Sequence, residues 1–508
     1  MSASLLMGID IGTSESKGCL VDFAGNVIAY ATEKHGMENP KPNYYEQDAE
    51  AIWWHDMYTL SNRLLEQSGK TGEDVACVGL STLGTCLLPV DENLKPLRKA
   101  ILYGIDARSV NEIAWLTEYY GEERVKELFG RPMVSGDVCA KILWVRNNEP
   151  EVYAKTYKFL TGTSYLVAKL TGKFMIDRFL GLASFRPFFD AEGRKREEMF
   201  EPFCRPDQLP DASVVTDIAG HVTAEAARVT GLKEGTPVII GTGDSTAEAI
   251  STGVLHAGDV MLQFGSSTFI YCCTDRLVTD DRVRGNNFTI PGTFSLAAGT
   301  NNCGLVTQWF RDKLFPELLE AEEKGGPNAY EAMMDAAKDI PIGSDGLVTL
   351  PYLAGERTPI NDPDASGVVL GLRSHHTKEH LYHSALEGIA FSVAQHIDIF
   401  REHEISPLRI HAVGGATRNA LLMQMVADAI REPVHIAAVT IGACYGDALM
   451  AGIGAGVFPD FESLQGIVRA SKVIEPDPDN FEAYEKFRAI YDEAYLATKD
   501  FMHRLARP

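Results

Sequence analysis

The chain of 508 residues is too long for one hydrophobic core, and its length predicts two domains of roughly 250 residues each. It carries 70 acidic and 47 basic residues, and the resulting net charge of −23 argues against nucleic acid or an anionic membrane as the main partner. An anionic substrate would need local cations or a metal ion to offset this charge.

The nine cysteines form no C-x-x-C pair and show no regular spacing, so we expect free thiols rather than a zinc site or a disulfide framework. The first residues, 1–7, lack the basic segment of a signal peptide. No apolar run approaches the roughly 18 residues of a membrane span. These features predict a cytoplasmic protein that does not bind membranes.

The first half of the chain alternates strand-like and helix-like segments, which predicts an α/β domain. A hairpin opens it, with apolar strands before and after a polar turn at 12–16. The expected strands are 5–11, 17–22, 27–32, 75–80, 87–90 and 101–103, and the expected helices are 49–67 and 110–129.

The pattern recurs in the second half. A strand at 260–264, a small polar turn at 265–267 and a return strand at 268–272 repeat the order of the opening hairpin. We interpret this as an internal duplication, with domains at 1–248 and 249–508. Further along, a strand is expected at 410–413 and a terminal helix at 481–505.

The turn Gly241-Thr242-Gly243-Asp244-Ser245 joins an apolar strand to a helix and is the strongest candidate for a catalytic site. Ser245 and Glu248 have the spacing of a capping box, which would leave Asp244 free. The positive end of the helix would favour the ionised carboxylate, which could take a proton from a hydroxyl group. The alternative is that Asp244 itself caps the helix.

A second candidate lies in the opening hairpin. Successive amides around Gly12 can form an anion-binding nest, to which the Thr13 and Ser14 hydroxyls and the Lys17 ammonium would add donors. Asp10, at the end of the strand, could hold Mg²⁺ through water. The alternative is an ordinary polar turn with a surface lysine.

Three weaker candidates are glycine turns of the second half. Paired glycines between a strand and a helix let a flat ligand lie against the backbone, and Asn419 could then bond the edge of a base. Each of these turns also fits a plain loop. Their residues are Gly265, Ser266 and Ser267; Gly304 and Gln308; and Gly414, Gly415 and Asn419.

Several well-known motifs are absent from the sequence. It contains no Walker A loop, no protein-kinase glycine loop, no H-E-x-x-H and no G-x-S-x-G. Any phosphate site must therefore be built from other glycine turns.

Taken together and in order, these segments resemble the FGGY family of carbohydrate kinases, within the sugar kinase, Hsp70 and actin superfamily. The resemblance covers nearly the whole chain. It rests on seven segments: 10–14, 141–148, 241–244, 265–267, 355–365, 385–391 and 414–425.

The resemblance implies two ribonuclease-H-like (actin-like ATPase) domains with a deep interdomain cleft. ATP would bind mainly against the second domain, and a small sugar mainly in the first. Asp244 would be the general base, and Asp10 and Asp244 would lie near Mg²⁺. Phosphate contacts would come from the turns around Thr13 and Ser266, and the nucleotide would meet the later glycine turns. Dimers are common among relatives, which suggests a homodimer.

The acceptor segments depart from the family pattern. Gly84 and Thr85 stand where glycerol kinases have Arg-Glu and typical xylulose kinases have Met-His, and Ser245 replaces an Asn common after the catalytic Asp. The pattern Trp-x-Asp-x-Arg occurs one residue longer, with Tyr103 and Asp106. These five positions, with Asp244, are the expected acceptor contacts. A ketopentose of the xylulose or ribulose type is the first choice; another sugar or polyol, or a nucleotide sensor without transfer, stays open.

Overall fold

The computed structural model describes residues 4–406 and 408–506. Residues 1–3 of the segment 1–7, in which no signal peptide is expected, lie outside the described residues. The chain forms two compact units. Unit 1 comprises residues 1–255, 286–293 and 441–468, and unit 2 comprises 256–285, 294–440 and 469–508. Each unit therefore takes in more than one segment of the chain, and residues 441–468 return to unit 1.

Unit 1 is built around a seven-stranded mixed sheet with the order β12-β13-β6-β1-β2-β3, in which β14 also pairs with β6. β1 is antiparallel to β2 and parallel to β6, and β6 is parallel to β13. Its strands are β1 (Leu5–Ile11), β2 (Glu15–Asp22), β3 (Val27–Lys34), β6 (Val75–Thr82), β12 (Ile218–His221), β13 (Pro237–Ile239) and β14 (Thr242–Gly243).

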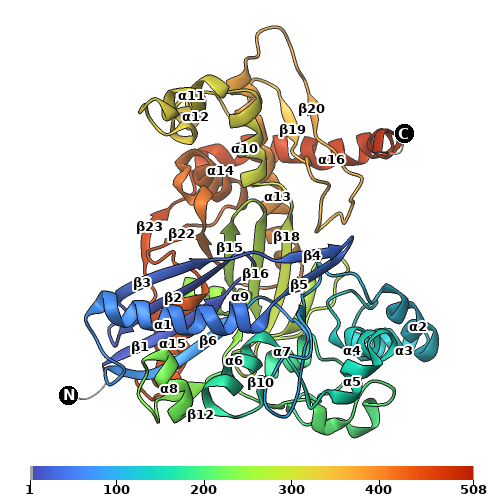
Figure 1. Cartoon of the computed structure of the whole chain (residues 1–508). Coiled ribbons are helices and arrows are strands. Elements are labelled where there is room, and N and C mark those ends of the chain that lie inside the picture. Colours follow the sequence, from blue (N-terminus) through green and yellow to red (C-terminus); the bar gives the residue numbers. More distant parts are fainter. Residues whose placement is uncertain (1–3, 407, 507–508) are drawn as a thin grey trace. The chain divides into compact units, whose positions relative to one another are not determined.

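Helices cover both faces of this sheet. α1 packs on β2 and β3, and α15 packs on β1, β2 and β6 beside α9 (Figure 1). The helices of unit 1 are α1 (His55–Ser68, preceded by a π-helical turn, Ala49–Trp54), α2 (Val110–Tyr120), α3 (Glu122–Phe129), α4 (Val138–Asn148), α5 (Pro150–Lys155), α6 (Gly162–Thr171), α7 (Arg178–Ala183), α8 (Ala224–Thr230), α9 (Asp244–Thr252) and α15 (Ala443–Gly454). Small sheets join β4 (Glu38–Lys41), β5 (Tyr44–Gln47) and β8 (Ala100–Ile101); β7 (Leu88–Val90) and β9 (Lys158–Leu160); and β10 (Met175–Asp177) and β11 (Asp211–Ser213).

The return of residues 441–468 to unit 1 depends on a close approach of two backbones. A Cβ atom added to Gly8 of β1 would lie 1.9 Å from the carbonyl oxygen of Cys444 in α15. Only glycine fits such a contact, because backbone atoms on both sides cannot move apart without separating the helix from the sheet.

Unit 2 repeats the same topology. Its sheet has the order β17-β18-β16-β15-β21-β22-β23. From β18 to β23 its strand directions match those from β3 to β12: two antiparallel pairs, two parallel pairs and a final antiparallel pair. The strands are β15 (Asp259–Phe264), β16 (Thr268–Thr274), β17 (Arg284–Asn287), β18 (Phe294–Thr300), β21 (Arg409–Val413), β22 (Val434–Ala437) and β23 (Ala470–Ile474), with a separate pair β19 (Val348–Leu350) and β20 (Val368–Leu370).

This repeat supports the predicted internal duplication. The helices of unit 2 are α10 (Gly304–Lys313), α11 (Pro316–Glu323), α12 (Ala329–Ala337), α13 (Lys378–Glu402), α14 (Ala420–Ile430) and α16 (Phe481–Ala506). None of the helices in the described part of the chain is long and apolar enough to cross a membrane.

Most expected elements are present, with two differences in the helices of unit 1. The helix expected at 110–129 is interrupted at Gly121, whose φ of 79° ends α2 before α3 begins. The helix expected at 49–67 begins with the π-helical turn. All nine cysteines are buried and are thiols rather than disulfides, as the sequence analysis expected.

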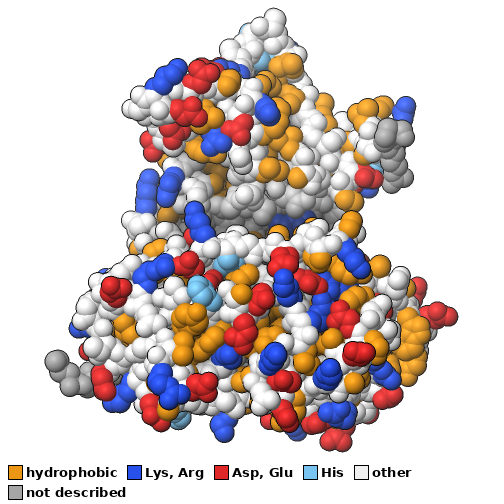
Figure 2. All heavy atoms as spheres, in the orientation of Figure 1, with side chains coloured by type: hydrophobic (Ala, Val, Ile, Leu, Met, Phe, Trp, Pro, Cys, Tyr) orange, Lys and Arg blue, Asp and Glu red, His pale blue; other side chains and the backbone are white. Residues whose placement is uncertain are grey.

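The surface of unit 1 has no concentration of one charge on the face drawn in Figure 2, where acidic and basic side chains are interspersed. Hydrophobic side chains gather over α2 in the same view, where Val110, Trp115 and Tyr119 are 61%, 44% and 56% exposed.

Candidate active site

Asp10 lies near the end of β1 in the core of unit 1 and is 7% exposed. The Ser81 hydroxyl lies 3.0 Å from Asp10 Oδ1 and 2.7 Å from Asp447 Oδ2. Burial, together with the nearby negative charge of Asp244, raises the pKa of Asp10 to about 8. Burial also raises the pKa of Asp447 well above its usual range. The sequence analysis missed Ser81 and Asp447, because neither stands in a glycine turn.

The turn that carries Asp244 is fixed by backbone geometry. Gly241 has a φ of 70°, and a Cβ atom there would lie 2.2 Å from the carbonyl oxygen of Leu80. The next two residues form β14 and pair with Ser81 and Thr82 of β6. Helix α9 then begins at Asp244. The predicted order of strand, glycine turn, carboxylate and helix is therefore present.

The expected capping box is absent from this turn. The N-cap of α9 is Gly243, and no side chain caps the helix. The Asp244 carboxylate instead accepts a 2.7 Å hydrogen bond from the backbone N–H of Ser245. Asp244 is thus free of a conventional N-cap role, as expected, but Ser245 does not replace it as the cap.

The electrostatic environment of Asp244 includes burial, an effect that the sequence analysis did not consider beside the helix end. Burial raises the pKa of Asp244 to about 6, although the backbone N–H groups of Ser245 and Gly84 oppose this shift. The residue remains partly exposed. Because it is partly exposed, the Asp244 carboxylate is accessible, and because its pKa is close to neutral, it is basic enough to accept a proton.

The expected acceptor residues Gly84, Thr85 and Tyr103 lie near this carboxylate within unit 1. The backbone N–H of Gly84 lowers the pKa of Asp244, and a Cβ atom on Gly84 would lie 3.4 Å from Tyr103 Cβ. The Tyr103 hydroxyl lies 3.3 Å from Thr13 Oγ1 of the first phosphate turn. Burial, with a smaller contribution from the charge of Asp244, raises the pKa of Tyr103.

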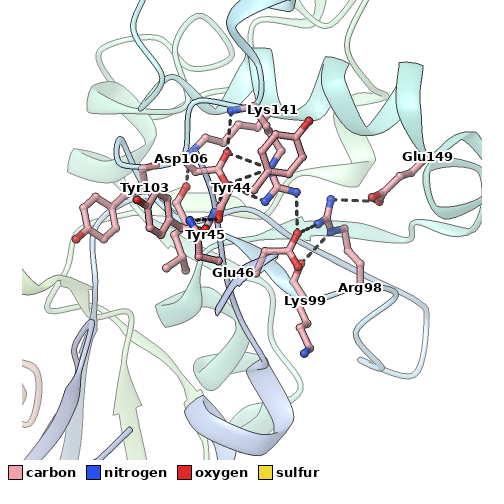
Figure 3. A network of polar contacts seen from close by, with 12 residues as sticks. Tyr44, Tyr45, Glu46, Arg98, Lys99, Tyr103, Asp106, Lys141 and Glu149 are labelled. Carbon is pink, nitrogen blue, oxygen red and sulfur yellow. Dashed lines mark hydrogen bonds and ion pairs between the residues drawn. The ribbon is translucent and has the colours of Figure 1, made fainter. Parts of the chain in front are cut away.

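Asp106, another expected acceptor contact, is fully buried and bonded to the protein (Figure 3). Its carboxylate pairs with Arg108 at 2.8 Å and accepts a 2.6 Å hydrogen bond from the Tyr45 N–H. Lys141, also fully buried, donates to the carbonyl oxygens of Leu102 and Tyr103. These side chains hold the loop that carries Tyr103; Asp106 has no exposed oxygen for a substrate.

The residues of the opening hairpin that are expected to contact phosphate are accessible to solvent. Gly12, Thr13 and Lys17 are partly exposed, and Ser14 is exposed. Lys17 lies 4.0 Å from Glu15, and its charge lowers the pKa of Asp10 against the larger effect of burial. The turn thus presents hydroxyl groups and one ammonium group beside a buried carboxyl group.

Unit 2 contains a pocket of about 530 Å³ at the carboxyl ends of its parallel strands. Six of the eight residues expected around a nucleotide line it: Gly265, Ser266, Gly304, Gln308, Gly415 and Asn419. Ser267 and Gly414 do not line this pocket. A volume of this size falls within the range of small-molecule and cofactor sites.

The far wall of the pocket comes from residues that the sequence analysis missed. These residues are Tyr330, Glu331 and Met334 of α12, its N-cap residue Asn328, and Tyr382 of α13. Nothing in a single sequence distinguishes these helical positions from others, because only the fold brings α12 beside α10.

The amide of Asn419 makes two hydrogen bonds within unit 2. Its oxygen caps α14 by accepting a 3.0 Å hydrogen bond from the Leu422 N–H, and its Nδ2 donates to Tyr382 Oη at 3.1 Å. These bonds fix the pocket wall, and the contact of Asn419 with the edge of a base stays a prediction.

The carboxylates of Asp10 and Asp244 are the kind of ligand that magnesium prefers, but the described residues do not form a complete set of metal ligands around them. Within residues 4–406 and 408–506, no three His, Cys, Asp or Glu side chains are grouped to hold a metal ion. The negative charge of Asp244 raises the pKa of Asp10, which means that a cation near both carboxylates would relieve repulsion. Mg²⁺ commonly uses one or two carboxylates and completes its shell with water and phosphate oxygens.

Comparisons with known proteins match nearly the whole chain. Models of the FGGY family of carbohydrate kinases match residues 5–251 with the N-terminal domain and 260–455 with the C-terminal domain. The chain is 28% identical to a xylulose kinase of Staphylococcus epidermidis over 98% of both chains, and 26% identical to a gluconokinase of Bacillus subtilis over 96% of this chain and 95% of that one. The crystal structure of xylulose kinase from Rhodospirillum rubrum superimposes with a TM-score of 0.88 at 29% identity, covering 98% of this chain and 100% of the other.

Proposed function

Since the chain belongs to the FGGY family of carbohydrate kinases, we propose that it transfers the γ-phosphoryl group of ATP to a hydroxyl group of a ketopentose, with Asp244 as the general base. The nucleotide would occupy the pocket of unit 2, and the sugar would lie beside Asp244, Gly84 and Tyr103 of unit 1. Thr13, Ser14 and Lys17 would contact the phosphates.

The observation that carries the proposal is the environment of Asp244. Its carboxyl group is partly exposed, its pKa of about 6 allows proton uptake near neutrality, and it lies at the start of α9 among the expected acceptor residues. A positioned base contributes about 10² to 10⁴ in rate, or roughly 3–5 kcal/mol. Positioning and charge neutralisation must provide most of the remaining acceleration, as in other phosphoryl transfers.

Asp10 and Asp244 would hold Mg²⁺, directly or through water. The ion would neutralise charge on the phosphate oxygens when bound. The chain's own contribution is to keep Asp10 oriented by Ser81 and to keep the Asp244 turn paired with β6.

A neutral acceptor fits the site better than an aldonate such as gluconate. A carboxylate substrate would need a cation, but Arg108 and Lys141, beside the acceptor loop, are both buried and bonded to protein groups. Tyr103 lies over Gly84 and fills space that glycine leaves open. This supports a compact, uncharged sugar such as xylulose or ribulose.

The experiment is a panel of ketopentoses, aldopentoses, hexuloses, polyols and gluconate with ATP and Mg²⁺, with ADP release as the measurement. We expect one ketopentose to stimulate turnover well above hydrolysis without sugar. Asp244→Asn should retain nucleotide binding and lose about 10² to 10⁴ in kcat, whereas Asp217→Asn, a surface turn residue of the same unit, should remain active. Equal turnover by Asp244→Asn and the parent would refute the assignment of the base.

A further inference from the structure

The short helix α7 connects two parts of the expected acceptor site within unit 1. At its start, Asp177 Oδ1 accepts a 3.1 Å hydrogen bond from the Phe179 N–H. Asp177 Oδ2 accepts a 2.7 Å hydrogen bond from the hydroxyl of Thr242, two residues before Asp244. At the other end of the helix, Ser184 Oγ accepts a 2.5 Å hydrogen bond from the hydroxyl of Thr85.

Thr242 is held at two of its polar groups. In addition to the bond from its hydroxyl to Asp177, its carbonyl oxygen accepts a 2.7 Å hydrogen bond from Thr163 Oγ1. Thr242 is fully buried and Asp177 is 2% exposed, so water cannot replace either partner. A buried hydrogen bond that loses one partner leaves an unsatisfied group and becomes costly.

The same helix also packs against the turn. A Cβ atom on Gly243, the residue between Thr242 and Asp244, would lie 3.4 Å from Leu180 Cδ2. Because Thr242 and Gly243 are paired with β6, the polypeptide has little freedom between the Asp177 contact and the carboxylate. A displacement of Thr242 is therefore transmitted to Asp244.

We propose that Asp177 is a positioning residue of the phosphoryl-acceptor site, which orients Asp244 through Thr242 and relates it to the Thr85 segment through α7. The assignment rests on the proposed kinase function, since it concerns the orientation of the base in that reaction. Asp177 does not contact the acceptor; it acts through the turn. Its other oxygen contact, 3.5 Å from Thr289 Oγ1, anchors it from a third segment of the same unit.

The test removes the hydroxyl of Thr242 while keeping its shape. We expect Thr242→Val to lower kcat about tenfold to hundredfold, because a small misplacement of a catalytic group has effects of this size, and to leave the KM for ATP within about twofold. Thr242→Ser keeps the donor and should restore most of the activity. Thr230→Val is the matched control, since Thr230 is equally buried in unit 1 and donates a 2.8 Å hydrogen bond to a helix carbonyl.

Amide hydrogen exchange over residues 241–246 provides a readout that does not require turnover. Exchange should be faster in Thr242→Val than in Thr242→Ser or Thr230→Val. The proposal is overturned if Thr242→Val exchanges and turns over like Thr230→Val, or if Thr242→Ser is as impaired as Thr242→Val. If no sugar is phosphorylated by the parent, the kinase function fails, and unchanged exchange in Thr242→Val would separately overturn the coupling.

Discussion

The pH dependence of sugar phosphorylation should reveal Asp244 directly. Burial raises the pKa of its carboxyl group to about 6, and only the ionised form can accept the proton of the sugar hydroxyl. Such a group is about 90% ionised at pH 7 and about 10% ionised at pH 5. We therefore expect kcat/KM for the sugar to fall at least about tenfold between these two pH values, since Asp10, whose pKa burial raises to about 8, also becomes protonated as the pH falls. An Asp with the ordinary pKa of 3.8 would remain about 90% ionised or more at pH 5, and activity would hardly change.

The assay measures ADP release at saturating ATP from pH 4.5 to 8.5, with circular dichroism at each pH to confirm that the protein stays folded. At saturating ATP, the kcat/KM profile for the sugar reports the ATP-bound enzyme before the sugar binds. Raising free Mg²⁺ should move the acidic limb to lower pH, because a cation near Asp10 and Asp244 favours both ionised carboxylates. A parent profile that stays flat down to pH 5, with the fold intact, would refute the argument that burial sets the basicity of Asp244.

Three substitutions test other parts of the structure. Gly8→Ala should destabilise unit 1 by about 1–3 kcal/mol in urea unfolding, because its Cβ would lie 1.9 Å from the Cys444 carbonyl oxygen, whereas Gly36→Ala, with open space around it, should be nearly neutral. Tyr103→Ala should raise the KM for the ketopentose and should increase the turnover of six-carbon ketoses relative to the turnover of the ketopentose. An unchanged ratio of these two turnover rates would show that Tyr103 does not limit the length of the acceptor. Asn419→Ala should lower the free energy of unfolding by about 1 kcal/mol, because the N-cap of α14 is lost, and should weaken nucleotide binding measured by calorimetry. Unchanged nucleotide affinity would show that this cap does not shape the pocket.

The parts of the fold that could be predicted from sequence are those with a local signal. The buried strand Leu5–Ile11 and the terminal helix each have an apolar pattern that their neighbours in sequence determine. The repeated order of strand, polar turn and strand also indicated the duplication. By contrast, Gly8 gives no local sign that α15, more than 400 residues later, packs against it.

The site divides in the same way. Glycine turns led to Asp10, Asp244 and six of the fifteen residues that line the pocket of unit 2, because glycine and a polar residue between strand and helix mark a ligand-facing turn. The helix end gave a local reason to expect an ionised Asp244, whereas burial, which raises its pKa to about 6, depends on distant contacts. The hydrogen bond from Asn419 to Tyr382 could not be predicted for a related reason, because Tyr382 belongs to another helix.

Asp106 shows how a motif can be correct in position and different in role. The family pattern places it on the acceptor side, and the loop that carries it does reach Tyr103 beside Asp244. Its carboxylate, however, neutralises the buried Arg108 guanidinium, and Lys141 holds the adjacent carbonyl groups. A buried charge without its partner is strongly destabilising, so these polar side chains are required to hold a loop one residue longer than the family pattern. Under the proposed function, substrate choice would depend on Tyr103, the side chain that this network presents, and the charged residues of the motif would act by keeping it in place.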